Sequence, residues 1–281
     1  CIRDSPVIVK SHPMHAGTGE LVSSAIIKAV KITGMPDGVF SNINSGGIQT
    51  GIDLVNNPLV KAIGFTGSLN AGRSLLNLAN KRDEPIPVFA EMGSVNPVII
   101  LPEILEKDLN NLAINYAKSI TLGSGQFCTN PGIIIGLKSE VFTQFVNSLS
   151  SNILDISPSC MLHPNILKNF EKNKNALITK NNVKVVAEFK ASTKPNYSKQ
   201  TLALVSGIDF INDKNLEEEI FGPFSLLVEC ENMTQLKSVI KHINGQLTGT
   251  ILATNNELLK NKDLIDILKE RVGRIIFNGV P

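Results

Sequence analysis

Two residues of this chain, Cys128 and Glu91, have side chains and surroundings that could perform covalent chemistry. Cys128 stands in Gly123-Ser-Gly-Gln-Phe-Cys-Thr-Asn-Pro-Gly132, directly before the apolar run Ile-Ile-Ile. A thiolate attacks carbonyl carbons efficiently, and nearby backbone amides favour the ionised thiol. Most cysteines of α/β proteins are instead inert, buried and packed like small hydrophobes. The glycine-rich context favours the nucleophile here.

Glu91 follows the strand-like run Val88–Ala90 and precedes Met92-Gly93. Open α/β sheets place functional groups at the carboxyl ends of their strands, so this carboxylate could serve as a general base. A glutamate taken alone is more often a solvated surface residue. The setting Glu-x-Gly-Ser-x-Asn-Pro makes a chemical role the preferred interpretation.

The composition is that of a globular protein that can bury a large core: 281 residues, 42% hydrophobic and 19% charged, with a net charge of +2. Lysines are interspersed with acidic residues, which argues against a nucleic-acid surface. No apolar run approaches the roughly 20 residues that span a bilayer, so we expect no membrane association. The four cysteines lack CxxC pairing and disulfide density, and the four histidines lack metal spacing. We therefore expect reduced thiols, a cytoplasmic location and no metal.

Short β-rich runs alternate with amphipathic segments in the first third, which predicts βαβ units around a parallel sheet. We expect one helix to be capped by Thr18 and ended by Gly34, and a glycine-led helix over 46–55. Residues 168–199, rich in Lys and Asn, are expected to form surface and connections. The strands are expected at Val7–Val9, Val39–Ile43, Ala62–Phe65, Val88–Ala90, Val98–Leu101 and Val183–Val186, and the further helices at Ser68–Asn80 and around Leu109–Ile120.

A domain boundary is expected near Gly93. The chain begins with Cys1 and a strand-like run, and it stops just after another, Gly273–Phe277. We therefore expect a polypeptide truncated at both ends, with residues 1–93 from a dinucleotide-binding domain and 94–281 from an incomplete catalytic domain.

Five ordered motifs resemble the aldehyde dehydrogenase superfamily across essentially the whole chain. They are Val-Ile-Val-Lys10, Gly64-Phe-Thr-Gly-Ser68, Glu91-Met-Gly-Ser-Val-Asn-Pro97, Gln126-Phe-Cys-Thr129 and Glu219-Ile-Phe-Gly-Pro223. The motifs around Ser94, Cys128 and Phe277 are most similar to the 2-oxoglutarate-semialdehyde dehydrogenase branch, which is also similar to NADP-dependent fatty-aldehyde dehydrogenases. The resemblance implies an α/β fold with a parallel Rossmann-type cofactor domain and an α/β catalytic domain.

The resemblance also implies a reaction. Cys128 would attack an aldehyde to give a thiohemiacetal, hydride would pass to a nicotinamide, and Glu91 would activate the water that hydrolyses the resulting thioester. The backbone N–H of Cys128 is one candidate oxyanion donor. The family's second donor, an asparagine, lies upstream of the strand that contains Lys10 and is expected to be missing from this sequence.

Cofactor binding is likewise implied by the resemblance. Lys10 would contact the adenosine ribose or a 2′-phosphate, and Gly67 and Ser68 would lie near the phosphates. Gly47 and Gly51 match a weaker glycine motif, in which Ser45 replaces a glycine. The remaining candidates are Glu219, which would hold the nicotinamide ribose, and Phe221, which would pack nearby. Pro13 stands where NAD-preferring relatives often carry a glutamate, so NADP or NAD is expected.

The substrate is expected to be a small aldehyde, most specifically 2,5-dioxopentanoate, and the full-length protein is expected to form a homo-oligomer. A fatty-aldehyde dehydrogenase is the nearest alternative. A thiol acyltransferase or hydrolase is a weaker one, because no suitably placed histidine accompanies Cys128. A silent fragment that only binds or assembles is the alternative from another class.

Overall fold

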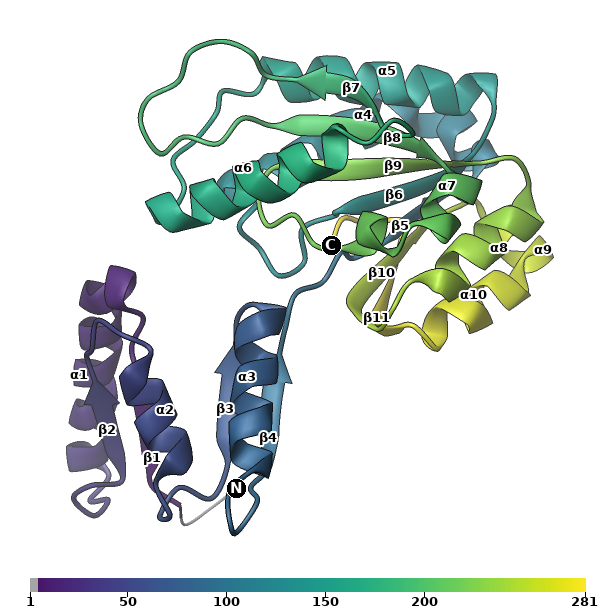
Figure 1. Ribbon diagram of the computed structural model, residues 1–281. Helices are drawn as coiled ribbons and strands as arrows, with labels where there is room; N and C mark the ends of the chain where they lie inside the picture. The colour runs from purple at the N-terminus through teal and green to yellow at the C-terminus, as the bar shows by residue number, and fades with distance from the viewer. Residues whose placement is uncertain (1–4) are drawn as a thin grey trace. The chain divides into compact units, whose positions relative to one another are not determined.

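A computed structural model describes residues 5–281, and its contacts divide the chain into two units after Gly93. Each unit is built from alternating strands and helices (Figure 1). The strands are β1 (Val7–Lys10), β2 (Phe40–Ile43), β3 (Ile63–Thr66), β4 (Val88–Glu91), β5 (Val98–Ile100), β6 (Ile133–Leu137), β7 (Lys184–Glu188), β8 (Thr201–Ser206), β9 (Phe224–Cys230), β10 (Gln246–Leu252) and β11 (Val272–Phe277). The α-helices are α1 (Ala16–Ile32), α2 (Gln49–Asn56), α3 (Leu69–Asn80), α4 (Pro102–Thr121), α5 (Glu140–Asp155), α6 (Pro164–Ile178), α7 (Gly207–Asn212), α8 (Met233–His242), α9 (Asn255–Lys260) and α10 (Lys262–Lys269), and the 3₁₀ helices are η1 (Pro13–His15), η2 (Leu122–Gly125) and η3 (Lys214–Glu217).

The first unit contains three successive βα steps, as predicted. The strands pair in parallel, β1 with β2 and β3 with β4, and the second pair packs with α2 and α3 around a small core of Val55, Ala79 and Ile86. The alternation of strands and helices predicted one parallel sheet, but among the described residues no ladder joins the two pairs.

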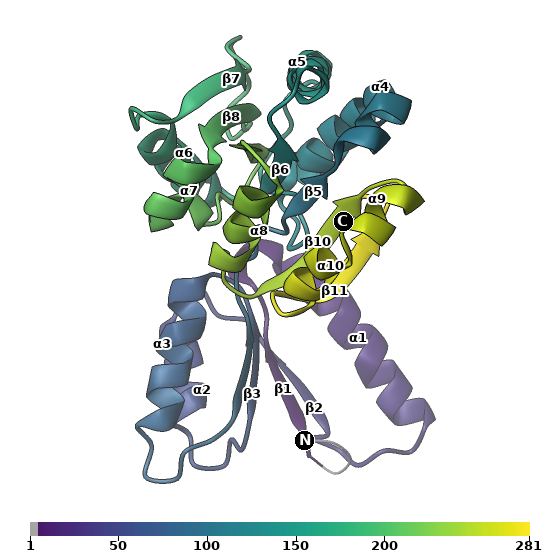
Figure 2. The same ribbon diagram turned by 90° about the vertical axis from the view of Figure 1, so that its right-hand side faces the viewer.

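The second unit is built on one seven-stranded sheet in the order β11-β10-β5-β6-β9-β8-β7. Every neighbouring pair is parallel except β7 with β8. Helices α4 and α5 cover one face, and α6, α7, α8 and α10 cover the other (Figures 1 and 2). The central strands are buried on both sides, which explains their unbroken runs of Val, Ile and Leu.

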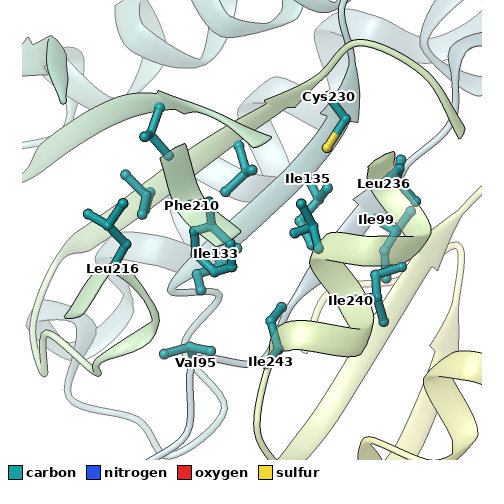
Figure 3. Close-up of a cluster of buried hydrophobic side chains, with 14 of the residues drawn as sticks. Val95, Ile99, Ile133, Ile135, Phe210, Leu216, Cys230, Leu236, Ile240 and Ile243 are labelled. Atoms are coloured by element: carbon teal, nitrogen blue, oxygen red, sulfur yellow. The ribbon is translucent and has the colours of Figure 1, made fainter. Parts of the chain in front are cut away.

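Successive residues of the central strands point to opposite faces of the sheet. Ile99 and Ile135 pack in the cluster with α7 and α8 that Figure 3 shows, whereas Val98 and Ile134 pack against α4 and α5. A change of register by one residue would exchange the two faces. Because both faces are apolar here, the helix contacts rather than polarity specify the register.

Three local predictions were wrong. Thr18 caps nothing: α1 begins at Ala16, and Thr18 lies in its first turn. The helix expected from Gly46 begins at Gln49, because Gly46, Gly47 and Ile48 form a bend before it.

The third error concerns residues 168–199, which include most of α6 rather than only surface and connections. His163 caps this helix through Nδ1, and Pro164 occupies its first turn. Phe170 and Leu177 are buried two turns apart. Their spacing is helical, but the surrounding Lys and Asn residues hide it in the sequence.

Leu149 provides a test of the core of the second unit, because its side chain is fully buried on α5. Replacing it with alanine leaves a cavity between α4 and α5, and we expect Leu149→Ala to lower the free energy of unfolding by about 2–5 kcal/mol. Leu154, on the same helix, is 38% exposed, so Leu154→Ala is the matched control with an expected loss below about 1 kcal/mol. Urea unfolding followed by circular dichroism measures both. Equal losses in the two variants would contradict this description of the core.

Candidate active site

Cys128 is exposed on the loop between η2 and β6. The 3₁₀ helix η2, directly before this loop, contains three consecutive residues with left-handed backbone, Gly123 (φ 54°), Ser124 (φ 59°) and Gly125 (φ 66°). Ser124 adopts this conformation without being a glycine, and its buried hydroxyl compensates through a 2.6 Å hydrogen bond with the Ser159 hydroxyl. The turn reverses the chain after α4, so that the loop with Cys128 lies at the amino end of β6.

The Cys128 loop is packed against the segment that contains Glu219 and Phe221. A Cβ atom on Gly125 would lie only 2.2 Å from the carbonyl carbon of Gly222, so only glycine fits at this position. The Asn130 side chain donates from Nδ2 to the Gly222 carbonyl at 3.1 Å. The structure therefore brings the expected nucleophile loop and two expected cofactor residues to one place.

A narrow pocket lies between these two segments, with a cavity of about 10 Å³ that could hold one water molecule. Phe127, Glu219, Phe221 and Ser94 are among its lining residues. Glu219 is partly buried here, and one carboxylate oxygen accepts a hydrogen bond from the Ser94 N–H at 3.2 Å. The hydrogen bond holds the carboxylate beside the Cys128 loop.

Burial raises the pKa of Glu219 above its usual value, and the Ser94 N–H opposes this only in part. The folded chain therefore keeps this proton to higher pH than the unfolded chain. The free energy of unfolding is accordingly expected to fall as the pH rises through the ordinary glutamate pKa and up to the raised one.

Glu219→Gln tests this pH dependence, because glutamine keeps an acceptor for Ser94 but has no proton to lose. The variant is expected to match the parent chain below the ordinary glutamate pKa, at about pH 4, and to become more stable than it as the pH rises from there through the raised pKa. Urea unfolding of both proteins across this range measures the difference. A stability difference that does not change with pH would show that Glu219 does not carry the raised pKa.

Other expected site residues gather at the carboxyl ends of strands in the first unit. Glu91 is the exposed last residue of β4 and pairs with Thr66, the last residue of β3. Gly67 donates its N–H to the Glu91 carbonyl at 3.0 Å, and Ser68 caps α3 by accepting from the Ala71 N–H. The expected base and the expected phosphate loop are thus neighbours.

Lys10 ends β1 opposite Ile43, which ends β2, so it lies at the carboxyl edge of its own strand pair. The bend at Gly47 follows this edge, whereas Gly51 lies within α2. A Cβ atom on Gly51 would meet nothing within 4 Å, and the buried Ser45 hydroxyl has no partner among the described residues. Packing within the chain therefore does not require a glycine at position 51. These features fit a phosphate-bearing cofactor.

Asn96 belongs to the Ser-Val-Asn-Pro motif of the sequence, which predicted no role for it. Its side chain is fully buried and hydrogen-bonds the carbonyl groups of Cys128 and Asn130. The sequence signal for this role was a polar residue inside the otherwise apolar run from Val95 to Leu101. Such a run is buried, and buried amides are almost always hydrogen-bonded. Asn96 thus belongs to the surroundings of the candidate nucleophile.

Two further properties of residues 5–281 concern other kinds of site. No group of three or more His, Cys, Asp or Glu side chains in this range could hold a metal ion. None of the helices in the same range combines the length and apolar composition that crossing a bilayer requires.

The aldehyde dehydrogenase family model matches residues 5–278. An α-ketoglutaric semialdehyde dehydrogenase of Acinetobacter baylyi is 39% identical over 98% of this chain and 52% of its own length. An α-ketoglutaric semialdehyde dehydrogenase 2 of Azospirillum brasilense is 36% identical over 98% and 53%. The chain thus spans about half the length of these relatives.

The fold has also been observed in solved structures. The crystal structure of an NAD-dependent benzaldehyde dehydrogenase from Corynebacterium glutamicum matches 98% of this chain and 58% of its own, with a TM-score of 0.80 and 19% sequence identity. At this identity the match concerns the fold alone. It confirms the α/β architecture that the sequence predicted.

Proposed function

Because this chain belongs to the aldehyde dehydrogenase family, we propose that it is part of an NAD(P)-dependent enzyme that oxidises an aldehyde to a carboxylic acid. The observation that carries the proposal is the packing of the Cys128 loop against the segment with Glu219 and Phe221. The proposed nucleophile and the residues proposed to hold a nicotinamide ribose lie on segments that pack together in the second unit.

Cys128 performs the covalent steps in this proposal. Its thiolate adds to the aldehyde carbon, the carbonyl π electrons move to oxygen, and a thiohemiacetal alkoxide forms. The Cys128 N–H makes no hydrogen bond within residues 5–281 and is free to donate to this oxygen. A bound NAD(P) would supply the acceptor for the hydride that leaves the same carbon, and Cys128 would then carry an acyl thioester.

Glu91 completes the reaction by removing a proton from water as it attacks the thioester carbon. The C–S bond breaks, the Cys128 thiolate is released, and the product leaves as a carboxylate. Glu91 suits this role because it is exposed at a strand end and free to exchange protons with solvent. A thioester is electrophilic enough for one carboxylate base to suffice.

The cofactor would be held by Lys10, by the glycine segments at Gly47, Gly51 and Gly67, by Ser68, and by Glu219 with Phe221. The start of α2 directly after the bend at Gly47 supports a phosphate there, because the first amides of a helix favour anions. Pro13 puts no carboxylate at the beginning of η1, so nothing at this position repels a 2′-phosphate. NADP is therefore the first cofactor to test, and NAD the second.

The substrate proposed is 2,5-dioxopentanoate, which would give 2-oxoglutarate. Support comes from the two relatives named as α-ketoglutaric semialdehyde dehydrogenases. The free thiols of Cys128, Cys160 and Cys230 are consistent with the cytoplasm, where cysteines stay reduced. We further propose that the longer protein forms a homo-oligomer.

The test is formation of reduced nicotinamide by the 281-residue chain and by a form extended at its N-terminus to the length of its relatives. Each is given 2,5-dioxopentanoate or a medium-chain aliphatic aldehyde, with NADP or NAD. Oxidation of 2,5-dioxopentanoate in either form supports the proposal. A strong preference for the aliphatic aldehyde would overturn the substrate, and no reduced nicotinamide in any combination would overturn the dehydrogenase.

A further inference from the structure

Asn96 connects three separate parts of the second unit through one side chain. Its Nδ2 donates to the Cys128 carbonyl at 2.8 Å and to the Asn130 carbonyl at 2.9 Å. Its Oδ1 accepts from the Thr248 hydroxyl at 3.0 Å, from the Thr248 N–H at 3.3 Å and from the Ser94 hydroxyl at 2.8 Å. Every polar atom of this fully buried amide therefore has partners.

The orientation of the amide is fixed by its partners. The two carbonyl oxygens can only accept, and the Thr248 N–H can only donate. Turning the amide over would place oxygen against oxygen at one end and N–H against N–H at the other. The Asn96 donors must therefore face the Cys128 loop.

The backbone at Asn96 explains why a side chain makes these contacts. Its φ angle of 43° is left-handed, and the extended backbone of β5 begins only two residues later, at Val98. Val98 pairs with Thr250 on one side and with Ile134 on the other. Asn96 thus lies just before the ladders that join β5 to β10 and β5 to β6. Its side-chain amide continues the hydrogen bonding to β10 and to the loop before β6. Asparagine is the ordinary residue best able to adopt this conformation and supply both donors and acceptors.

We infer that Asn96 is a positioning residue, which fixes the backbone of Cys128 from its carbonyl side and leaves the Cys128 N–H and thiol free for the substrate. The inference rests on the proposed function. A fixed carbonyl holds the peptide plane after Cys128, and the Cα–Cβ bond that carries the thiol can then no longer tilt with the loop. Misplacement of a reacting group by about 1 Å costs about 100-fold in rate.

Asn96→Asp tests the inference, because aspartate keeps the shape and the acceptor for Thr248 but as a carboxylate donates nothing to the two carbonyls. Hydrogen exchange of the hydrogen-bonded amides of Asn130 and Gly132 is expected to become at least about tenfold faster, whereas amides of α5 are expected to keep their protection. In a form with measurable activity, kcat should fall about 100-fold while KM for NADP changes less than about threefold.

Thr248→Val is the matched control, since it removes only the hydroxyl that donates to Asn96 Oδ1. It is expected to leave the exchange of the Asn130 and Gly132 amides within about threefold of the parent chain. Asn96→Gly, which tolerates the positive φ angle, replaces Asn96→Asp if the latter does not fold.

Unchanged exchange of the Asn130 and Gly132 amides in Asn96→Asp, or an equal increase in Thr248→Val, would overturn the positioning role. The exchange measurement needs no catalysis, so it separates the two proposals. Faster exchange in Asn96→Asp alone supports positioning even if no aldehyde is oxidised, in which case only the proposed function fails.

Discussion

Replacing Cys128 by serine is expected to abolish formation of reduced nicotinamide, with a loss on the order of 10⁴-fold or more in kcat. A serine hydroxyl is hardly ionised at neutral pH, so the addition to the aldehyde carbon does not take place. The fold should be unaffected, because Cys128 is exposed on its loop and makes no side-chain hydrogen bond within residues 5–281. The steady-state rate with 2,5-dioxopentanoate and NADP measures the effect.

Cys160→Ser is the control for this experiment, because Cys160 is a second exposed thiol in the same unit. Its loss is expected to change kcat less than about threefold. A Cys128→Ser variant that keeps a tenth or more of the parent rate would refute the covalent mechanism. Equal losses of kcat in both variants would show that the loss is not specific to Cys128 and would argue against its role as the nucleophile.

The reactive groups of the second unit gather at an unusual edge of the sheet. Open α/β sheets commonly place functional groups at the carboxyl ends of their strands, and Glu91 of the first unit follows that pattern. Cys128, however, precedes β6, Asn96 precedes β5, and Glu219 precedes β9. Because β5, β6 and β9 are adjacent and parallel, these residues share the amino-terminal edge. The sequence motifs alone could not show this shared edge. Each motif lies in a connection between a helix and a strand, and its sequence does not reveal which edge of the sheet it reaches.

Much of the fold could be predicted because its determinants are local. Runs of β-branched residues at β1, β5 and β6 lie where strands were expected, and Gly34 with its positive φ angle follows α1. The helix α6 was missed because most of its residues are polar, and its helical character shows only in the spacing of a few buried side chains. Tertiary packing, which sequence periodicity reports weakly, decides such segments.

The candidate site was only partly predictable for a related reason. Cys128, Glu219 and Phe221 were expected from motifs, and the structure brings their segments together through Gly125 and Gly222. The role of Asn96 depends on partners 32 and 152 positions away, Cys128 and Thr248. Contacts at such separations are a property of the folded sheet, and a buried polar residue in an apolar run is the only local sign of them.

Glu91→Gln is expected to divide the proposed reaction into its two halves. Glutamine keeps the size of the side chain but cannot take a proton from water, so thioester formation should proceed while hydrolysis slows by about 10²–10⁴-fold. One equivalent of reduced nicotinamide should therefore appear in a burst, followed by a slow steady state. Mass spectrometry should find the acyl group on the peptide that contains Cys128.

Glu84→Gln is the control, because Glu84 is also an exposed carboxylate of the first unit, and its ion pair with Lys61 at 3.4 Å contributes little. It should show no burst and the parent steady-state rate. An external nucleophile such as hydroxylamine attacks a thioester without a base, so it should restore turnover in Glu91→Gln. If Glu91→Gln lost the burst together with the steady state, Glu91 would act before the thioester forms, and the role of hydrolytic base would pass to another residue.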